Sequence, residues 1–321
     1  MSNLIRYFLL LRLRFGKWTD AAVFAPQWSN AAATVRLCFC FASLLIFTAW
    51  LDSLTRWVGV GGPLTRDVTS FLIGEGLEDS GAAFRVSPLY ATDQPVWLNA
   101  YLVGGVIASL VAMSGFGGRL SLAVLWLWLL GLLHRVAPIQ SHGEILVSTF
   151  MPYLLIDQGW LAHPSRVGFS DDQRRWTVRL MLALMRCHLI IWLAMSLAFH
   201  LGQSIWWDGT APEVIASMGN SLLFGPTSFS GSPWFATILA NSWLLLHVAT
   251  IAALCLSRAA VMATILSTIF WLGGWVWTGD WLYAVGGLAV SSCLYFDASL
   301  EWKTLRRPAA GSPAAASTAS R

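Results

Sequence analysis

Eight apolar stretches dominate this chain of 321 residues and determine what it can fold into. A helix needs about 20 largely apolar residues to cross a bilayer, because the hydrocarbon core is about 30 Å thick and each helical residue rises about 1.5 Å. Only 11% of the residues are charged, against roughly 25% in soluble domains. We therefore predict an all-α integral membrane protein with eight transmembrane helices. The predicted spans are Ala33–Leu51, Pro95–Met113, Leu120–Val136, Gly143–Ile156, Val178–Leu201, Pro233–Leu256, Ala259–Trp277 and Trp281–Phe296.

The basic residues indicate how these spans are oriented. If the N-terminus is cytoplasmic, 15 of the 20 Lys and Arg residues fall on the cytoplasmic side, and the outer loop 202–234 holds none. This asymmetry follows the positive-inside rule, so both termini are predicted to be cytoplasmic. The short fourth stretch also fits a re-entrant segment, but without it Arg166, Arg174 and Arg175 would lie outside. We therefore retain it as a span.

The two ends of the chain differ from the predicted membrane domain at residues 33–297. Residues 1–32 mix Leu and Phe with four basic residues, Arg6, Arg12, Arg14 and Lys17. This pattern fits an amphipathic helix on the cytoplasmic membrane surface or one packed beneath the bundle. No cleavable signal peptide is expected there. The tail at 298–321 ends in an Ala-, Ser- and Pro-rich stretch, which is predicted to be disordered from about residue 308.

Ionisable side chains gather at the outer ends of the predicted spans, where they are costly and typical of functional sites. An imidazole with an ordinary pKa of about 6.5 suits proton transfer at neutral pH. We expect His200 to accept a proton, with His142 or Glu144 holding its tautomer. The candidate substrate-binding residues near the same depth are Trp206, Trp207, Asp208 and Arg135. Interface anchoring by the tryptophans and capping of the next segment by Asp208 are the structural alternatives.

Three further polar residues, Arg186, His188 and His247, are predicted to be buried within spans. For Arg186, a structural bond inside the bundle and a functional role are both open. Because no two histidines are spaced i, i+4 and no HExxH occurs, we predict no metal site. Tryptophans near the outer boundary, including Trp50 and Trp277, are expected mainly to anchor the protein at the interface.

Three motifs resemble the HTTM family, the membrane domain shared by vitamin K-dependent gamma-carboxylases and many bacterial proteins. The segment Leu132-Leu133-His134-Arg135 with His142-Gly143-Glu144 resembles the family's Arg at a span end and its Gly-acid opening of the next span. The segment Met185-Arg186-Cys187-His188 resembles its Leu-Arg-x-Gln helix start. Phe199-His200-Leu201-Gly202 before Trp206-Trp207-Asp208-Gly209-Thr210-Ala211 is similar to its Lys-Leu pair followed by Trp-x-acid-Gly-Thr-Ala. The resemblance covers about Thr34 to Phe296.

Within that family, the chain is most similar to the sporulation-delaying protein B group, whose members help to mature a secreted antimicrobial peptide. Their Phe-Gly-x-Pro-like segment resembles Leu223-Phe224-Gly225-Pro226 here. The resemblance implies a bacterial cytoplasmic (inner) membrane location, a secreted peptide substrate, a co-encoded partner protein and a lipidic quinone as cofactor. It places His200 where the carboxylases have the Lys that deprotonates reduced vitamin K, and the chain stops before their large lumenal domain. Vitamin K-dependent carboxylation by this chain alone is therefore not expected.

Three functions stay open on these observations. The first is a membrane enzyme or maturation factor that acts on a peptide or lipidic substrate at the outer surface. The second is a non-catalytic scaffold for a partner protein, favoured by the basic cytoplasmic face and by the absence of the family's Lys. The third is a small-molecule transporter, against which stands the lack of an internal repeat. The lipid bilayer is a partner in each case, and a net charge of +4 does not favour nucleic acid.

Overall fold

The computed structural model describes residues 31–65, 68, 71, 87–156, 171–218, 221–224, 228, 233–256 and 260–306, and their side chains except at 31, 171–176 and 295–306. Residues 1–30 of the predicted amphipathic segment and the tail from residue 307 lie outside this part.

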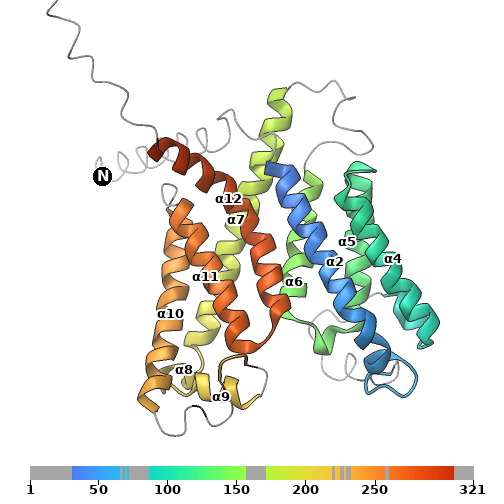
Figure 1. The fold of residues 1–321 in the computed structure, drawn as a ribbon, viewed down its shortest axis with the longest axis horizontal. Coiled ribbons are helices and arrows are strands. Elements are labelled where there is room, and N and C mark those ends of the chain that lie inside the picture. Colours follow the sequence, from blue (N-terminus) through green and yellow to red (C-terminus); the bar gives the residue numbers. More distant parts are fainter. Residues whose placement is uncertain are drawn as a thin grey trace, which may run out of the picture.

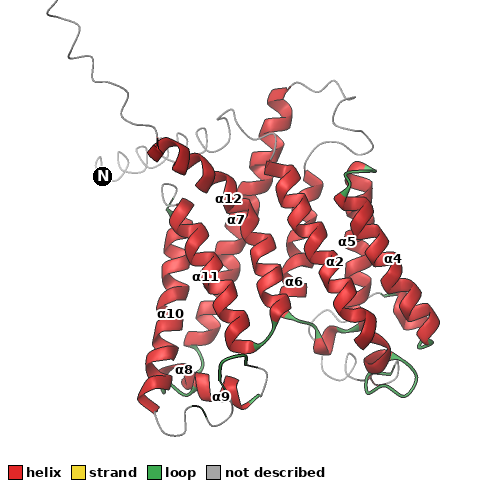
Figure 2. Ribbon diagram, viewed as in Figure 1, coloured by secondary structure: helices red, strands yellow, loops and turns green. Residues whose placement is uncertain are grey.

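Throughout the described part, the regular secondary structure is helical and no strand occurs (Figures 1 and 2). Successive helical segments cross the bundle in alternate directions when the short segment at residues 142–156 is counted as one of them, and short helices lie in several of the connections. The long helices are α2 (Ala31–Val58), α4 (Pro95–Met113), α5 (Gly118–Arg135), α7 (Asp171–Leu201), α10 (Pro233–Cys255), α11 (Ala260–Thr278) and α12 (Trp281–Arg306). The shorter ones are η2 (Pro88–Ala91), η3 (Ala137–Ile139), α6 (His142–Phe150) continued by η4 (Met151–Ile156), α8 (Ser204–Trp207) and α9 (Ala211–Ser217).

Within the described residues, five helices are long and apolar enough to cross a membrane, which indicates a multi-pass membrane protein. They are the segments Ala32–Val58, Pro95–Met113, Thr177–Leu201, Pro233–Cys255 and Ala260–Thr278. The remaining three predicted spans are helical as well, as α5, as α6 with η4, and as the first part of α12, but they are shorter or less apolar.

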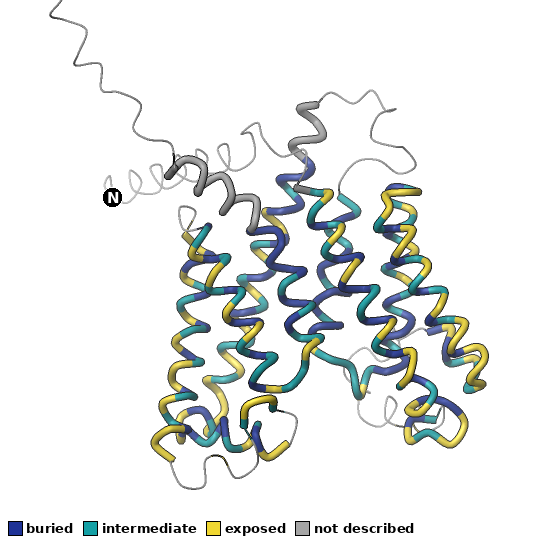
Figure 3. Tube along the Cα trace, viewed as in Figure 1, coloured by how far each residue is buried: buried dark blue, intermediate teal, exposed yellow. Residues whose placement is uncertain are grey.

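The outward faces of these helices are apolar, as a lipid environment requires. On α11, Met262, Ile265 and Ile269 are about half exposed, while Ser267 and Phe270 on the opposite face are buried. The same alternation of exposed and buried residues runs along α2, α4, α5, α7 and α10, whereas in the described part of α12 only Trp281 is exposed (Figure 3). In water, so many exposed aliphatic side chains would be strongly unfavourable, whereas a bilayer accepts them without cost.

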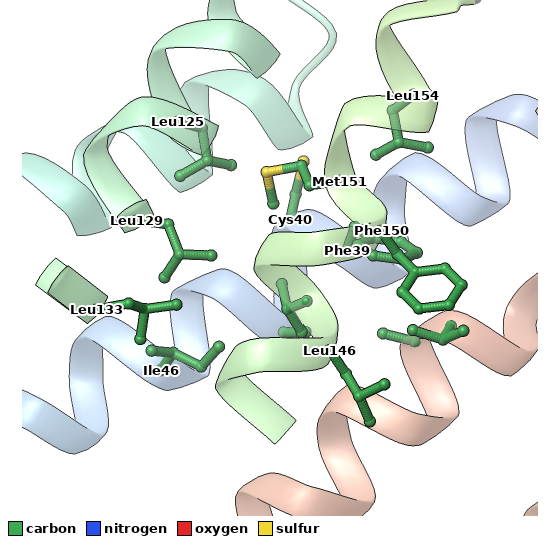
Figure 4. Packing of buried hydrophobic residues seen from close by; sticks show 14 of the residues in the cluster. Phe39, Cys40, Ile46, Leu125, Leu129, Leu133, Leu146, Phe150, Met151 and Leu154 are labelled. Carbon is green, nitrogen blue, oxygen red and sulfur yellow. The ribbon is translucent and has the colours of Figure 1, made fainter. Parts of the chain in front are cut away.

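The core holds α2, α5, α6 and α12 together. Buried side chains from α2, α5 and the α6–η4 segment interlock in it (Figure 4); they include Phe39, Cys40, Ile46, Leu125, Leu129, Leu133, Leu146, Phe150, Met151 and Leu154. Where α6 approaches α12, the two backbones come close because the residues in contact are glycines, which have no side chain. A Cβ atom on Gly143 would overlap the carbonyl oxygen of Leu282, and one on Gly286 would overlap the carbonyl oxygen of Gly143.

Arginines tie helix ends together at the upper end of the bundle in Figure 1. Arg36 Nε donates to the Ala112 carbonyl at the end of α4 (2.9 Å). Arg119 Nη2 donates to the Ile156 carbonyl at the end of η4 (2.7 Å). The last carbonyls of a helix have no partner within it and carry negative partial charge, so a neighbouring guanidinium stabilises them. Part of the basic excess on the predicted cytoplasmic side therefore has a structural use.

Candidate functional site

The chain reverses direction just after His200, in the last turn of α7. The Gly202 amide still donates to the Ala198 carbonyl (3.0 Å), and the Gln203 amide donates to the His200 carbonyl (3.1 Å). This turn leads directly into α8, which folds back so that the buried ring of Trp206 lies against the half-buried ring of His200, with their centroids 4.6 Å apart. The neighbouring residue Phe199 is exposed on the outside of the bundle.

His247 of α10 lies on the inner side of His200, with the ring centroids 5.6 Å apart and the planes at 69°. The residue is 0% exposed. Among the described residues, neither nitrogen of the His247 ring has a hydrogen-bond partner, and Nδ1 of His200 is likewise buried and unpartnered. The backbone of Leu193 approaches the His247 ring but makes no hydrogen bond of normal geometry with it. Two imidazoles thus face each other with three polar atoms unsatisfied.

Aromatic side chains surround this histidine pair. Phe270 packs on His247 at 4.7 Å and stacks on Trp243 at 4.8 Å. Trp277 contacts Trp206 at 5.9 Å and Trp243 at 5.0 Å, edge to face in both cases. The sequence pattern predicted Trp277 as an interface anchor, but it is only 5% exposed and its Nε1 is unpartnered. The surroundings of the pair are therefore apolar, and one unpaired N–H donor lies among them.

The unpaired atoms are energetically unusual. More than about 90% of buried polar groups in proteins make a hydrogen bond, and each one left without a partner costs about 1–3 kcal/mol. Here four such atoms, on His200, His247 and Trp277, belong to one aromatic cluster at the junction of α7, α10 and α11. Ionisable groups at membrane depth are retained chiefly for function. We take these three residues with Trp206, Trp243 and Phe270 as the candidate site.

Glu144 is fully buried but lies in a different place from the expected one. One of its carboxylate oxygens accepts from Trp50 Nε1 and the other from the Ser141 amide (2.7 Å), which completes a capping box at the start of α6. The Ser141 hydroxyl donates to Asp280 (2.6 Å) and so ties α6 to the start of α12. The expectation that Glu144 holds the tautomer of His200 is thus not met. The Ser-x-x-Glu spacing at 141–144 is a capping-box signature that could have indicated this role.

His142 lies beside that network, not beside His200. It is exposed, and its ring meets the edge of Tyr283 on α12 at 6.4 Å. His200 instead has His247 as its imidazole neighbour. The outer interface role expected for Trp50 is also replaced, because Trp50 is 7% exposed and donates to Glu144.

The candidate substrate-binding residues divide between two places. Trp206 belongs to the site, and Trp207 and Asp208 follow it on the exposed surface, where Trp207 Nε1 donates to the Leu201 carbonyl (2.7 Å). Arg135 lies elsewhere: it is fully buried at the end of α5 and pairs with Asp93 at 3.0 Å. It also approaches the Val58 carbonyl at the end of α2 and lies over the Tyr90 ring.

Of the three polar residues predicted to be buried within spans, His247 is fully buried, whereas Arg186 and His188 are only half-buried. Arg186 donates to the Leu254 carbonyl at the end of α10 and to that of Leu256 (3.2 Å). His188 stacks on Phe150 at 4.5 Å, and its Nδ1 is 2.9 Å from the Tyr153 hydroxyl. Only His247 contacts His200. Among the described residues, no group of three or more His, Cys, Asp or Glu side chains could hold a metal ion.

Comparison of the chain with protein-family models, curated proteins and solved structures finds no match.

Proposed function

We propose that this protein is an eight-span protein of the bacterial cytoplasmic membrane that acts in the maturation of a secreted peptide, with His200 and His247 as the proton-accepting groups of its site. Both termini lie in the cytoplasm, and the site lies near the outer membrane face. The positive-inside distribution of Lys and Arg supports this orientation, and the alternating course of α2, α4, α5, α6, α7, α10, α11 and α12 is compatible with eight crossings.

The observation that carries the proposal is the complete burial of His247 with both ring nitrogens unpartnered, next to an unpartnered nitrogen of His200. A purely structural histidine at this depth would be satisfied by a carbonyl or a hydroxyl, as His188 is by Tyr153. A neutral imidazole both accepts and donates a hydrogen bond. The pair can therefore receive a proton from a hydroxyl held among the aromatic rings.

The surroundings fit an uncharged ligand with an apolar ring. Trp206, Trp243, Phe270 and Trp277 supply aromatic faces and edges, which pack on flat rings. The unpartnered Trp277 Nε1 is a hydrogen-bond donor and the imidazoles are acceptors. The reduced form of the lipidic quinone implied by the HTTM resemblance has this chemistry: its hydroxyl groups would donate to nitrogens of His200 and His247 and could lose a proton to them. The role in peptide maturation rests on the resemblance of the 199–211 and 223–226 motifs.

A maturation assay in the native host tests the proposal. His200→Ala should remove most of the production of the mature peptide, and His200→Lys should restore part of it, because an amine also accepts a proton. Immunoblots of membrane fractions establish that each variant is present at the wild-type level. His134→Ala is the matched control, since it removes a histidine at the end of α5, outside the site, and should leave maturation unchanged. Normal maturation by His200→Ala would overturn the proposal and favour the scaffold.

A further inference from the structure

The two histidines differ in their access to the outside of the bundle. His200 is half-buried in the last turn of α7, beside exposed Phe199 and Leu201, while its Nδ1 is buried. His247 is fully enclosed behind it. Since the two rings are in edge contact, His200 lies between the outer end of the bundle and His247.

In the described part of the chain, α10 and α11 place no other ionisable side chain beside the pair. His247 is the only ionisable residue of α10 apart from Cys255 at its end, and α11 has none. On α7, His188 bonds to Tyr153 and Arg186 caps α10, both nearer the opposite end of the bundle. Asp208 after α8 is exposed and Glu213 on α9 is half-buried, both at the outer end. A proton that reaches His247 therefore has His200 as its nearest ionisable neighbour.

We propose that His247 and His200 form a proton relay, in which His247 receives a proton from the bound ligand and His200 passes it to the outer face. The inference rests on the proposed function, because it assigns the path of the proton that the site accepts. Without the relay, His200 would be the only proton acceptor of the site, and His247 would only pack against it.

The step balances in atoms and charge. The ligand O–H bond breaks as an N–H bond forms on the free nitrogen of His247, which becomes an imidazolium. Because no hydrogen bond joins the two rings, the proton on the other nitrogen of His247 then moves to Nδ1 of His200 through one bridging water molecule. His200 releases the proton on its own other nitrogen at the outer end. One proton has crossed the pair, and both rings are neutral again with their tautomers exchanged.

Hydrogen–deuterium exchange of the histidine ring protons tests the relay without a maturation assay. The full-length protein, labelled with ¹⁵N-histidine and reconstituted in lipid bilayers, is transferred to D₂O, and the ring N–H signals are followed by solid-state NMR. Single His→Gln variants assign the six histidines. In wild type, the His247 ring should exchange with solvent through His200. In His200→Phe, whose ring blocks the route without carrying a proton, exchange at His247 should slow at least tenfold.

His134→Phe is the matched control and should leave the exchange rate at His247 unchanged. His200→Leu provides a second blocking variant if His200→Phe does not fold. An unchanged exchange rate at His247 in a folded blocking variant would overturn the relay. The failure of the proposed function gives a different pattern. Slowed exchange at His247 in the blocking variant, together with normal peptide maturation by His200→Ala, would sustain the relay and refute the maturation role. Unchanged exchange at His247, together with loss of maturation in His200→Ala, would refute only the relay.

Discussion

The guanidinium of Arg186 holds the Leu254 carbonyl with two nitrogens, Nε at 2.9 Å and Nη2 at 2.7 Å. Leu254 is the penultimate residue of α10, so an arginine in the middle of α7 caps the C-terminal end of α10. From the sequence, either a structural bond inside the bundle or a functional role was open for Arg186. The structural bond accounts for its contacts. The same arrangement joins Arg36 to α4 and Arg119 to η4.

Arg186→Leu should destabilise the folded protein by about 1.5–3 kcal/mol, because charge-assisted hydrogen bonds to the end of α10 are lost. The measurement is the midpoint of thermal unfolding of the purified protein in detergent. Arg56→Leu is the matched control: its side chain is 73% exposed and pairs with exposed Asp52, so its removal should change stability by about 1 kcal/mol at most. Equal effects of the two substitutions would contradict the capping role.

Gly143→Ala should prevent the close packing of α6 on α12, because the added methyl group overlaps the backbone of Leu282. Backbone atoms cannot move aside as a flexible side chain does, so the helices must separate and the Ser141–Asp280 bond breaks with them. The yield of monodisperse protein in size-exclusion chromatography should fall to a small fraction of wild type. Gly202→Ala, whose added methyl meets only ordinary contacts at 3.4 Å, should elute as wild type does.

Reporter fusions test the eight-span topology where it is least determined by length, at α6 and η4. Alkaline phosphatase is active only outside the cytoplasm, and green fluorescent protein fluoresces only when folded inside it. A fusion after Gln140 should show phosphatase activity, whereas one between residues 157 and 170 should fluoresce, because six residues of η4 continue the nine of α6 toward the opposite end. Phosphatase activity at both points would show that this segment re-enters and does not cross.

His247→Phe should stabilise the protein in the absence of ligand. The substitution replaces two buried, unpartnered nitrogens with an apolar ring of similar size among Phe270 and the other aromatic side chains, and removing an unsatisfied buried group lowers the cost of folding by about 1–3 kcal/mol. The thermal midpoint should therefore rise. By contrast, His188→Phe removes the hydrogen bond between His188 and Tyr153 and should lower the thermal midpoint. A fall in the midpoint for His247→Phe would indicate a structural role for His247.

Hydropathy located the helices well but not their ends. The predicted span Pro95–Met113 coincides with α4, whereas α2 continues past Leu51 to Val58 and α7 begins at Asp171 before the predicted Val178. Apolar residues mark the part of a helix that faces lipid, and helices extend into water with polar residues such as Asp52 and Arg56. Hydropathy therefore cannot detect these extensions.

The site was predictable only in part. His200 stood out because an ionisable residue ends an apolar run, and His247 because it interrupts one. Their pairing depends on which helices are neighbours, which periodicity does not reveal, so Glu144 and His142 were expected beside His200. Trp243 and Phe270 carried no signal, because an aromatic residue in an apolar span looks the same whether it faces lipid or a site.

The most direct test of the central claim is a double-mutant cycle in the maturation assay, with His200→Ala, His247→Phe and the double variant at equal membrane levels. If the two histidines act as one proton path, each single variant should lose most of the activity, and the double variant should be no worse than the weaker single one, because the second substitution removes a path already broken. Wild-type maturation by either single variant, or losses that simply multiply in the double variant, would contradict the account.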